Sequence, residues 1–251
     1  MSKAQAVLFI HGIGGAGRVW AGQAASFAAA GFAPLAPDLP GYGGRPPVTA
    51  MDFAGLAEDA EAFLARHAAR QPVLVGHSMG GMVAQTMLRR RPHAYAAAVL
   101  ACTSPAFGNA DGHFQRAFVA DRLRPLDAGT TMSELAPAMV DRMMGPRPHA
   151  AGRALAVEVM QSVPADTYRA AVRCLAAFDE RANLARIAIP VLCVAGASDA
   201  NAPPAVVERM ASKIPGARYV CLANVGHLPS LEAPQAFNAA VLAFLRSLSP
   251  A

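Results

Sequence analysis

A serine between flanking glycines is the residue best placed for chemistry, in the stretch Gly76-His77-Ser78-Met79-Gly80-Gly81. A continuous apolar run at 72–76 precedes it, and a helical pattern over 79–91 follows. A tight strand-to-helix turn would strain the serine backbone and raise its hydroxyl above the sheet, while the glycines let the strand and the helix approach each other. The helix N-terminus would also stabilise negative charge. The pattern therefore predicts that Ser78 is a nucleophile.

A glycine-rich loop, His11-Gly12-Ile13-Gly14-Gly15, follows the first apolar run. The backbone N–H of Ile13, together with that of Met79, could donate hydrogen bonds to an oxyanion. A phosphate-binding loop is the alternative, but neither G-x-x-x-x-G-K-[ST] nor a complete G-x-G-x-x-G is present. The loop is therefore interpreted as half of an oxyanion hole.

An acid and a histidine follow the serine in the chain order that such a nucleophile requires. Asp199 comes just after the apolar run 190–196, and His227 lies between the run 218–222 and the last helical segment. The loop after the run 97–102 offers no carboxylate as an alternative acid. The sequence predicts that Asp199 orients His227 and that His227 takes the proton of Ser78.

Short apolar runs alternate with helix-period segments along the chain, which indicates a parallel sheet with crossover helices. The runs are apolar throughout, so both faces of the sheet should be covered. The predicted strands are 5–10, 32–36, 72–76, 97–102, 190–196 and 218–222. The predicted helices between them are 18–30, 52–68, 79–91, 203–213 and 233–248.

Residues 104–182 interrupt this alternation, because they contain no strand-like run. They are predicted to form three or four short amphipathic helices, separated by prolines and glycines. The sequence thus divides into a core of 1–103 and 183–251 and an all-helical cap of 104–182. Methionines are concentrated in the cap, and they could line a substrate pocket or simply pack the insertion on itself.

These motifs resemble the α/β-hydrolase superfamily over nearly the whole chain. The resemblance implies an α/β-hydrolase fold with a mostly parallel sheet of about six strands flanked by helices, and with a reduced N-terminal hairpin. It also implies structural rather than catalytic roles for His11 and Asp38. Several short segments look like 3-oxoadipate enol-lactonase and related carboxylesterases: 162–174, 183–184, 189–190 and 214–217.

The predicted function is that of a cofactor-free serine hydrolase that cleaves a small carboxylic ester or lactone through an acyl-enzyme. The cap would select the substrate. Met143 and Met144 are expected to set the acyl length. The lactonase resemblance implies that an arginine among Arg116, Arg169 and Arg173 holds a substrate carboxylate.

Other reactions on the same three residues remain open. They are carbon–carbon bond hydrolysis of ring-cleavage products and perhydrolase or haloperoxidase chemistry. A hydroxynitrile lyase is less favoured, because those enzymes carry a lysine where this chain has Leu228. Dehalogenases and epoxide hydrolases need an aspartate at position 78.

Composition narrows the class of protein. The 251 residues carry 22 basic and 17 acidic side chains, a net charge of +5, but the arginines are scattered and no RNA-binding aromatic motif is present, so no nucleic-acid partner is expected. No apolar stretch is long enough to span a membrane. The four cysteines are widely spaced and the histidines lack metal-ligand spacing, so we expect no disulfide and no metal. The chain enters its first strand without room for a signal peptide, which favours the cytoplasm; the oligomeric state is left open.

Overall fold

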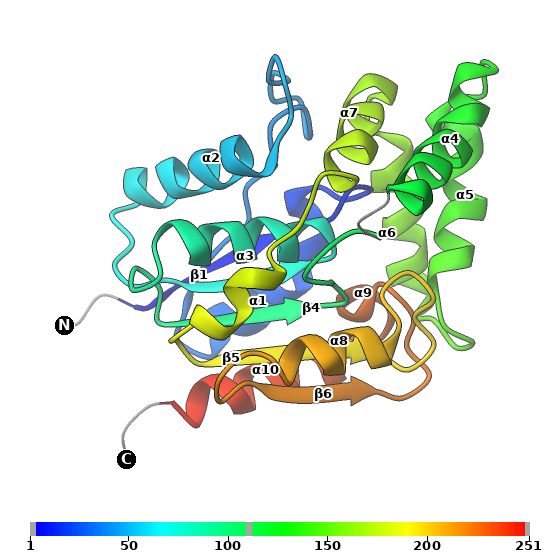
Figure 1. The fold of residues 1–251 in the computed structure, drawn as a ribbon. Coiled ribbons are helices and arrows are strands. Elements are labelled where there is room, and N and C mark those ends of the chain that lie inside the picture. The colour runs from blue at the N-terminus through cyan, green and yellow to red at the C-terminus, as the bar shows by residue number, and fades with distance from the viewer. Residues whose placement is uncertain (1–3, 109–111, 249–251) are drawn as a thin grey trace.

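The computed structural model describes residues 4–108 and 112–248. Within these residues one sheet of six parallel strands forms, in the order β2-β1-β3-β4-β5-β6 (Figure 1). The α/β fold with a mostly parallel sheet of about six strands is confirmed, and each predicted run contains a strand. The strands are β1 (Ala6–Ile10), β2 (Ala33–Leu35), β3 (Val73–His77), β4 (Ala97–Ala101), β5 (Val191–Gly196) and β6 (Arg218–Leu222).

The strand order changes direction beside β1. The chain passes from β1 outward to β2, then returns to place β3 on the other side of β1, with Ile10 opposite Gly76. The loops that follow β1 and β3 therefore leave the sheet in different directions, and a crevice opens between them at the carboxyl ends of the strands. The loop 11–15 and Ser78 both lie at this point.

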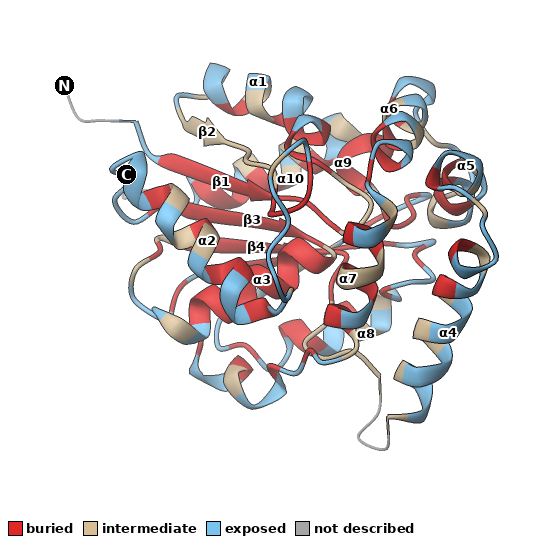
Figure 2. Cartoon of the chain, turned by 90° about the horizontal axis from the view of Figure 1, so that it is seen from above, coloured by how far each residue is buried: buried red, intermediate tan, exposed pale blue. Residues whose placement is uncertain are grey.

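Helices cover both faces of the sheet, as the apolar strands require (Figure 2). On one face, α1 (Ala21–Ala29), preceded by the 3-10 turn η1 (Gly17–Trp20), packs against α10 (Pro234–Arg246). On the other face, α2 (Phe53–Arg66) packs against α3 (Met79–Arg90). The remaining core elements are the 3-10 turn η2 (Arg181–Arg186), α8 (Pro204–Ala211) and α9 (Pro229–Glu232).

The chain between β4 and β5 forms helices in its described part, and they gather beyond the carboxyl ends of the strands (Figure 1). A capping box of Thr131 and Glu134 fixes the start of α5, and an isolated bridge between Ala106 and Asp179 joins the two ends of the segment. The four helices are α4 (His113–Asp127), α5 (Met132–Met143), α6 (Ala150–Gln161) and α7 (Ala165–Leu175).

None of the helices in the described ranges has the length and apolar character that crossing a membrane would need.

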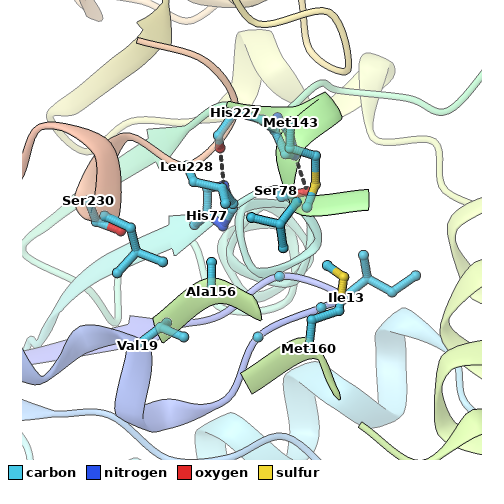
Figure 3. Close-up of a pocket in the computed structure, with 15 residues that line it drawn as sticks. Ile13, Val19, His77, Ser78, Met143, Ala156, Met160, His227, Leu228 and Ser230 are labelled. Carbon is cyan, nitrogen blue, oxygen red and sulfur yellow. Dashed lines mark hydrogen bonds between the residues drawn. The ribbon is translucent and has the colours of Figure 1, made fainter. Parts of the chain in front are cut away.

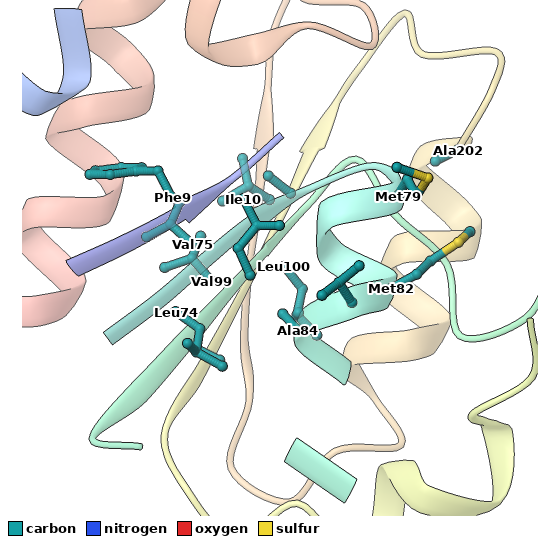
Figure 4. Close-up of a cluster of buried hydrophobic side chains, with 14 of the residues drawn as sticks. Phe9, Ile10, Leu74, Val75, Met79, Met82, Ala84, Val99, Leu100 and Ala202 are labelled. Carbon is teal, nitrogen blue, oxygen red and sulfur yellow. The ribbon is translucent and has the colours of Figure 1, made fainter. Parts of the chain in front are cut away.

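The hydrophobic core is centred on the middle strands and on α3 (Figure 4). Phe9 of β1 contacts the rings of Trp20 and Phe27, each at a centroid distance of 5.1 Å, and so fastens α1 to the sheet. On the other side, Met79 and Val83 of α3 are fully buried. This burial fixes α3 rigidly beneath the turn that carries Ser78.

Glycines permit the close contact of β1, β3 and α3. A Cβ on Gly76 would lie 2.4 Å from the carbonyl oxygen of Gly80, and a Cβ on Gly80 would lie 2.1 Å from that of Ile10. Both obstacles are backbone atoms, which cannot move without displacing a strand or a helix. No side chain fits at either position.

We expect Gly80→Ala to lower the free energy of unfolding by on the order of 2 kcal/mol or more, because the methyl group forces α3 away from β1. Gly22→Ala is the matched control, since a Cβ on Gly22 in α1 would meet no atom within 4 Å. That change should be neutral or stabilising by up to about 1 kcal/mol. Urea denaturation measures both; equal stabilities for the two variants would contradict this account of the packing.

Candidate active site

Ser78 occupies the turn between β3 and α3 with a backbone that few residues other than glycine adopt, φ 53° and ψ −120°. Hydrogen bonds hold it in place on both sides. Its N–H donates to the carbonyl oxygen of Ala101 (3.0 Å), and its own carbonyl oxygen accepts from Thr103 Oγ1 (2.8 Å). The strain is therefore balanced by the end of β4 and the loop after it, and the hydroxyl is left directed into the crevice.

The structure brings Ser78, Asp199 and His227 together, although they lie on loops after three different strands. His227 Nε2 is 3.0 Å from Ser78 Oγ, and His227 Nδ1 is 2.8 Å from Asp199 Oδ2 (Figure 3 shows His227 beside Ser78). Nδ1 donates to the carboxylate, which leaves Nε2 free to accept the hydroxyl proton. The arrangement can move a proton from the serine to the histidine.

Asp199 is buried and nevertheless held in its charged form. Burial by itself would raise the pKa of Asp199, but hydrogen bonds from His227 and from the backbone N–H groups of Asn201 and Ala202 outweigh it, and the pKa lies below its ordinary value. The two N–H groups donate to Oδ1 at 2.8 and 3.0 Å. The other oxygen, Oδ2, accepts the hydrogen bond from His227 Nδ1.

His77 positions the His227 loop, a role that the sequence argument missed. Its Nε2 donates to the carbonyl oxygen of His227 at 2.6 Å (Figure 3). Burial lowers the pKa of His77 to about 3, so the ring is neutral. Its position next to the serine in sequence was the available signal, but sequence alone does not show which loop the ring would contact.

The glycine-rich loop after β1 is fixed by His11 and Tyr42. His11 Nδ1 donates to the carbonyl oxygen of Gly12 (2.9 Å), its Nε2 accepts from the N–H of Leu39 (3.0 Å), and Tyr42 donates its hydroxyl hydrogen to the carbonyl oxygen of Ile13 (3.0 Å). Burial lowers the pKa of His11 to about 4, so it is a neutral bridge rather than a titrating group. These contacts agree with a structural role for His11.

Two backbone donors near the serine are available for an oxyanion. Met79 is the first residue of α3, where a backbone N–H has no partner within its own helix. The neighbouring N–H groups of Gly81 and Met82 already donate to Ser78. Ile13 lines the space around Ser78, and within residues 4–108 and 112–248 its N–H has no hydrogen-bond acceptor.

Glu232 joins the histidine loop to the helical segment. Its buried carboxylate accepts three backbone hydrogen bonds, from Gly145 (2.7 Å), Gly226 (2.9 Å) and Leu228 (2.9 Å). The N–H of His227 itself donates to the carbonyl oxygen of Met143 at 2.7 Å. The loop that carries His227 is therefore held from both sides, by Glu232 of α9 and by the end of α5.

Two cavities meet at Ser78. The smaller, of about 50 Å³, lies toward η1, α6 and α9 and is lined by Val19, Ala156 and Leu228 (Figure 3). The larger, of about 450 Å³, lies beneath α4 and α7. Five residues border both cavities: Ile13, Ser78, Met143, Met160 and His227.

The cap residues expected at the pocket are only partly found there. Met143 lines both cavities, whereas Met144 and the three arginines line neither. Arg169 turns outward to ion pairs with Asp127 (3.2 Å) and Asp166 (3.3 Å). Arg122, Met160 and Tyr168 take their place as lining residues. The linings of these two cavities therefore give no support to Met144, Arg116, Arg169 and Arg173 as substrate-binding residues, because helix packing decides which side of α4 and α7 faces the cavity.

One group of potential metal ligands includes the same residues. Atoms of Cys102, Asp199 and His227 lie within 4.8 Å of one another. Burial raises the pKa of the Cys102 thiol well above its ordinary value, and His227 Nδ1 is already bonded to Asp199. The chemistry of this group favours a protonated thiol and a hydrogen-bonded pair over a set of metal ligands.

The chain belongs to the alpha/beta hydrolase family, whose model matches residues 7–240. BpoC of Mycobacterium tuberculosis, which bears the name of a non-heme bromoperoxidase, is 28% identical over 250 residues, or 96% of this chain and 94% of that protein. The pimeloyl-[acyl-carrier protein] methyl ester esterase of Aromatoleum aromaticum is 31% identical over 245 residues, or 91% and 93%. The crystal structure of the enol-lactonase from Burkholderia xenovorans LB400 has the same fold, with a TM-score of 0.86 at 24% identity over 98% of this chain and 92% of that one. These relatives differ in named activity, so the family alone does not set the substrate.

The two buried histidines predict how stability depends on pH. The folded-state pKa values of about 4 for His11 and about 3 for His77 lie below the ordinary 6.5, so the unfolded chain binds protons first as the pH falls. Stability should be fully present above about pH 6.5 and decline toward pH 4, by about 1.4 kcal/mol per pH unit for each histidine.

Urea unfolding between pH 7 and 4.5 measures this slope. His77→Gln should remove about half of the histidine contribution, while the exposed His93→Gln serves as the control. An unchanged slope in His77→Gln would show that burial of this ring does not couple folding to protons.

Proposed function

We propose that this protein is a serine hydrolase that cleaves a carboxylic ester or lactone through an acyl-enzyme, with Ser78, His227 and Asp199 as the catalytic residues. One observation carries the proposal: an uninterrupted line of hydrogen bonds runs from the charged Asp199 through His227 to the strained Ser78. The esterase relative supports the same reaction class.

Acylation begins when Ser78 Oγ attacks the carbonyl carbon and its proton passes to His227 Nε2. Asp199 stabilises the imidazolium through the bond to Nδ1. The oxyanion is held by the N–H groups of Ile13 and Met79, and each such donor contributes about 3 kcal/mol in well-studied enzymes. Collapse of this intermediate expels the alkoxide, which takes the proton back from Nε2.

Deacylation repeats the sequence with water as the nucleophile. His227 removes a proton from the water as it attacks the acyl carbon, and then returns that proton to Ser78 as the acid product leaves. No cofactor is needed at any step, because the protein supplies the nucleophile, the base and the oxyanion donors.

The segment 104–182 is proposed to act as a cap that selects substrates. Its helices supply Met143 and Met160, which border both cavities, and Ala156, which lines the smaller one. The carbonyl oxygen of Met143 also anchors His227. Substrate binding under the cap and the position of the base are therefore linked through one residue.

Perhydrolysis is a second candidate, favoured by the likeness to BpoC. Hydrogen peroxide would replace water in deacylation and release a peracid, using the same three residues. Carbon–carbon bond hydrolysis stays an alternative without a specific observation in its favour. An assay of peracid formation in the presence of hydrogen peroxide distinguishes perhydrolysis from hydrolysis by water.

Ser78→Ala should abolish both labelling by a fluorophosphonate probe and turnover of 4-nitrophenyl esters, because no other group can form the acyl bond. Ser198→Ala is the matched control: it removes an exposed serine from the loop of Asp199 and should leave both signals unchanged. Wild-type turnover by Ser78→Ala would show that the nucleophile is another residue.

Asp199→Asn should lower kcat on the order of 10⁴-fold, since an amide cannot fix the histidine tautomer or stabilise the imidazolium. Steady-state kinetics measure the loss, and circular dichroism checks that the variant is folded. A decrease of less than about 10-fold would assign the acid role to a different carboxylate.

A further inference from the structure

The larger cavity holds an arginine that the proposed reaction does not use. Most of the side chains around this cavity are apolar, among them Phe107, Phe118 and Leu175. Arg122 on α4 lines the same space and is half-buried. A cation in such a setting loses part of its hydration, and proteins normally compensate this loss with an anion or with several hydrogen bonds.

The contacts of Arg122 hold its side chain in place without neutralising it. Its guanidinium lies over the ring of Phe118, 5.2 Å from the centroid. Its positive charge also acts on the buried hydroxyl of Tyr168: burial raises the pKa of this hydroxyl, and Arg122 offsets part of that rise. Stacking on a ring uses none of the five N–H donors of an arginine, so these donors remain available for a ligand.

No carboxylate in the described part of the chain forms an ion pair with Arg122, although other arginines have them. Arg45 pairs with Asp59 at 2.7 Å and Arg153 with Asp141 at 2.7 Å. Among the described residues that line the cavity, the one acidic side chain is Asp121, which is 71% exposed and lies 3.4 Å from Arg124. Asp121 therefore leaves Arg122 as an uncompensated positive charge at the cavity wall.

We propose that Arg122, together with the Tyr168 hydroxyl, binds a carboxylate of the substrate, so that the preferred substrates are esters or lactones that carry a free carboxylate. The inference rests on the proposed function and names the substrate class for the same site. A guanidinium accommodates a carboxylate through two parallel hydrogen bonds, and the apolar walls strengthen that interaction.

The two cavities decide where the carboxylate lies in the substrate. The smaller cavity, of about 50 Å³, accepts a group such as a methyl, whereas the larger one, of about 450 Å³, accommodates a chain of several carbons. The carboxylate therefore lies at the end of the longer substituent. Monomethyl esters of dicarboxylic acids and acetyl esters of ω-hydroxy acids both meet this description, and they place the carboxylate on the acyl and the alcohol side, respectively.

Matched substrate pairs test the proposal. Monomethyl succinate, glutarate and adipate are compared with neutral methyl esters of equal chain length, and 4-acetoxybutanoate with butyl acetate, by following acid release in a pH-stat. The wild-type protein should favour the carboxylate member of at least one pair by on the order of 10- to 100-fold in kcat/KM. The chain length that gives the largest ratio reports the reach from Ser78 to Arg122.

Substitutions at Arg122 test whether this residue causes the preference for substrates that carry a carboxylate. Arg122→Gln should remove it mainly through KM, with turnover of the neutral esters retained, while Arg122→Lys should keep part of it. Arg142→Gln is the control, because Arg142 is exposed on α5 and lines neither cavity. Asp121→Asn should leave the ratio unchanged or increase it. A ratio near one in the wild-type protein, or an equal ratio in Arg122→Gln, would overturn the proposal.

A binding measurement separates this inference from the proposed reaction. Calorimetry with monomethyl glutarate and the Ser78→Ala protein requires no turnover, and the ester should bind there but bind at least 10-fold more weakly to the double variant Ser78→Ala/Arg122→Gln. If binding to Ser78→Ala depends on Arg122 but the wild-type protein shows no esterase activity, the proposed reaction is contradicted and the carboxylate site is retained. If the wild-type protein is an esterase but binding of the ester does not depend on Arg122, the carboxylate site is contradicted and the proposed reaction is retained.

Discussion

The turn at Ser78 is the constraint on which the rest of the site depends. A residue with φ 53° and ψ −120° is stable only where its neighbours leave it no other conformation. Here Gly76 and Gly80 bring β3, α3 and β1 within contact distance, and Ala101 and Thr103 bind the serine backbone from β4 and the loop after it. The fully buried side of α3 then prevents the turn from relaxing.

The positions of the other groups follow from the sheet. Because all six strands in the described part of the chain are parallel, the loops after β1, β3, β5 and β6 emerge at one edge. That edge collects the loop 11–15, Ser78, Asp199 and His227. Glu232 and the carbonyl oxygen of Met143 then fix the His227 loop against the helices above it, so a loop residue reaches the precision that proton transfer requires.

The core and the residues that meet at its edge could be predicted from the sequence because each has a local signature. An apolar run followed by Ser78, Asp199 or His227 marks the end of a parallel strand, and the chain order of the three residues adds a second constraint. The six strands and the helices between them were found for the same reason, with boundaries that differ by at most three residues.

The cap side chains could not be predicted in this way. Helices α4 to α7 pack on one another and on the core at angles that no local pattern encodes, so the sequence indicated an arginine near the substrate without showing which one. Arg169 turned out to be engaged by two aspartates, and Arg122 was found at the cavity. His77 and Glu232 were missed for a related reason, because their partners are backbone atoms distant in sequence.

The most direct test of the account is to trap the covalent intermediate. Rapid acid quench of the protein during turnover of 4-nitrophenyl acetate, followed by mass spectrometry of the intact chain and its peptides, reports whether and where an acetyl group is attached. The account predicts one acetyl group per chain, on the peptide that contains Ser78. Turnover with no adduct, or an acetyl group on another residue such as Cys102, would contradict it.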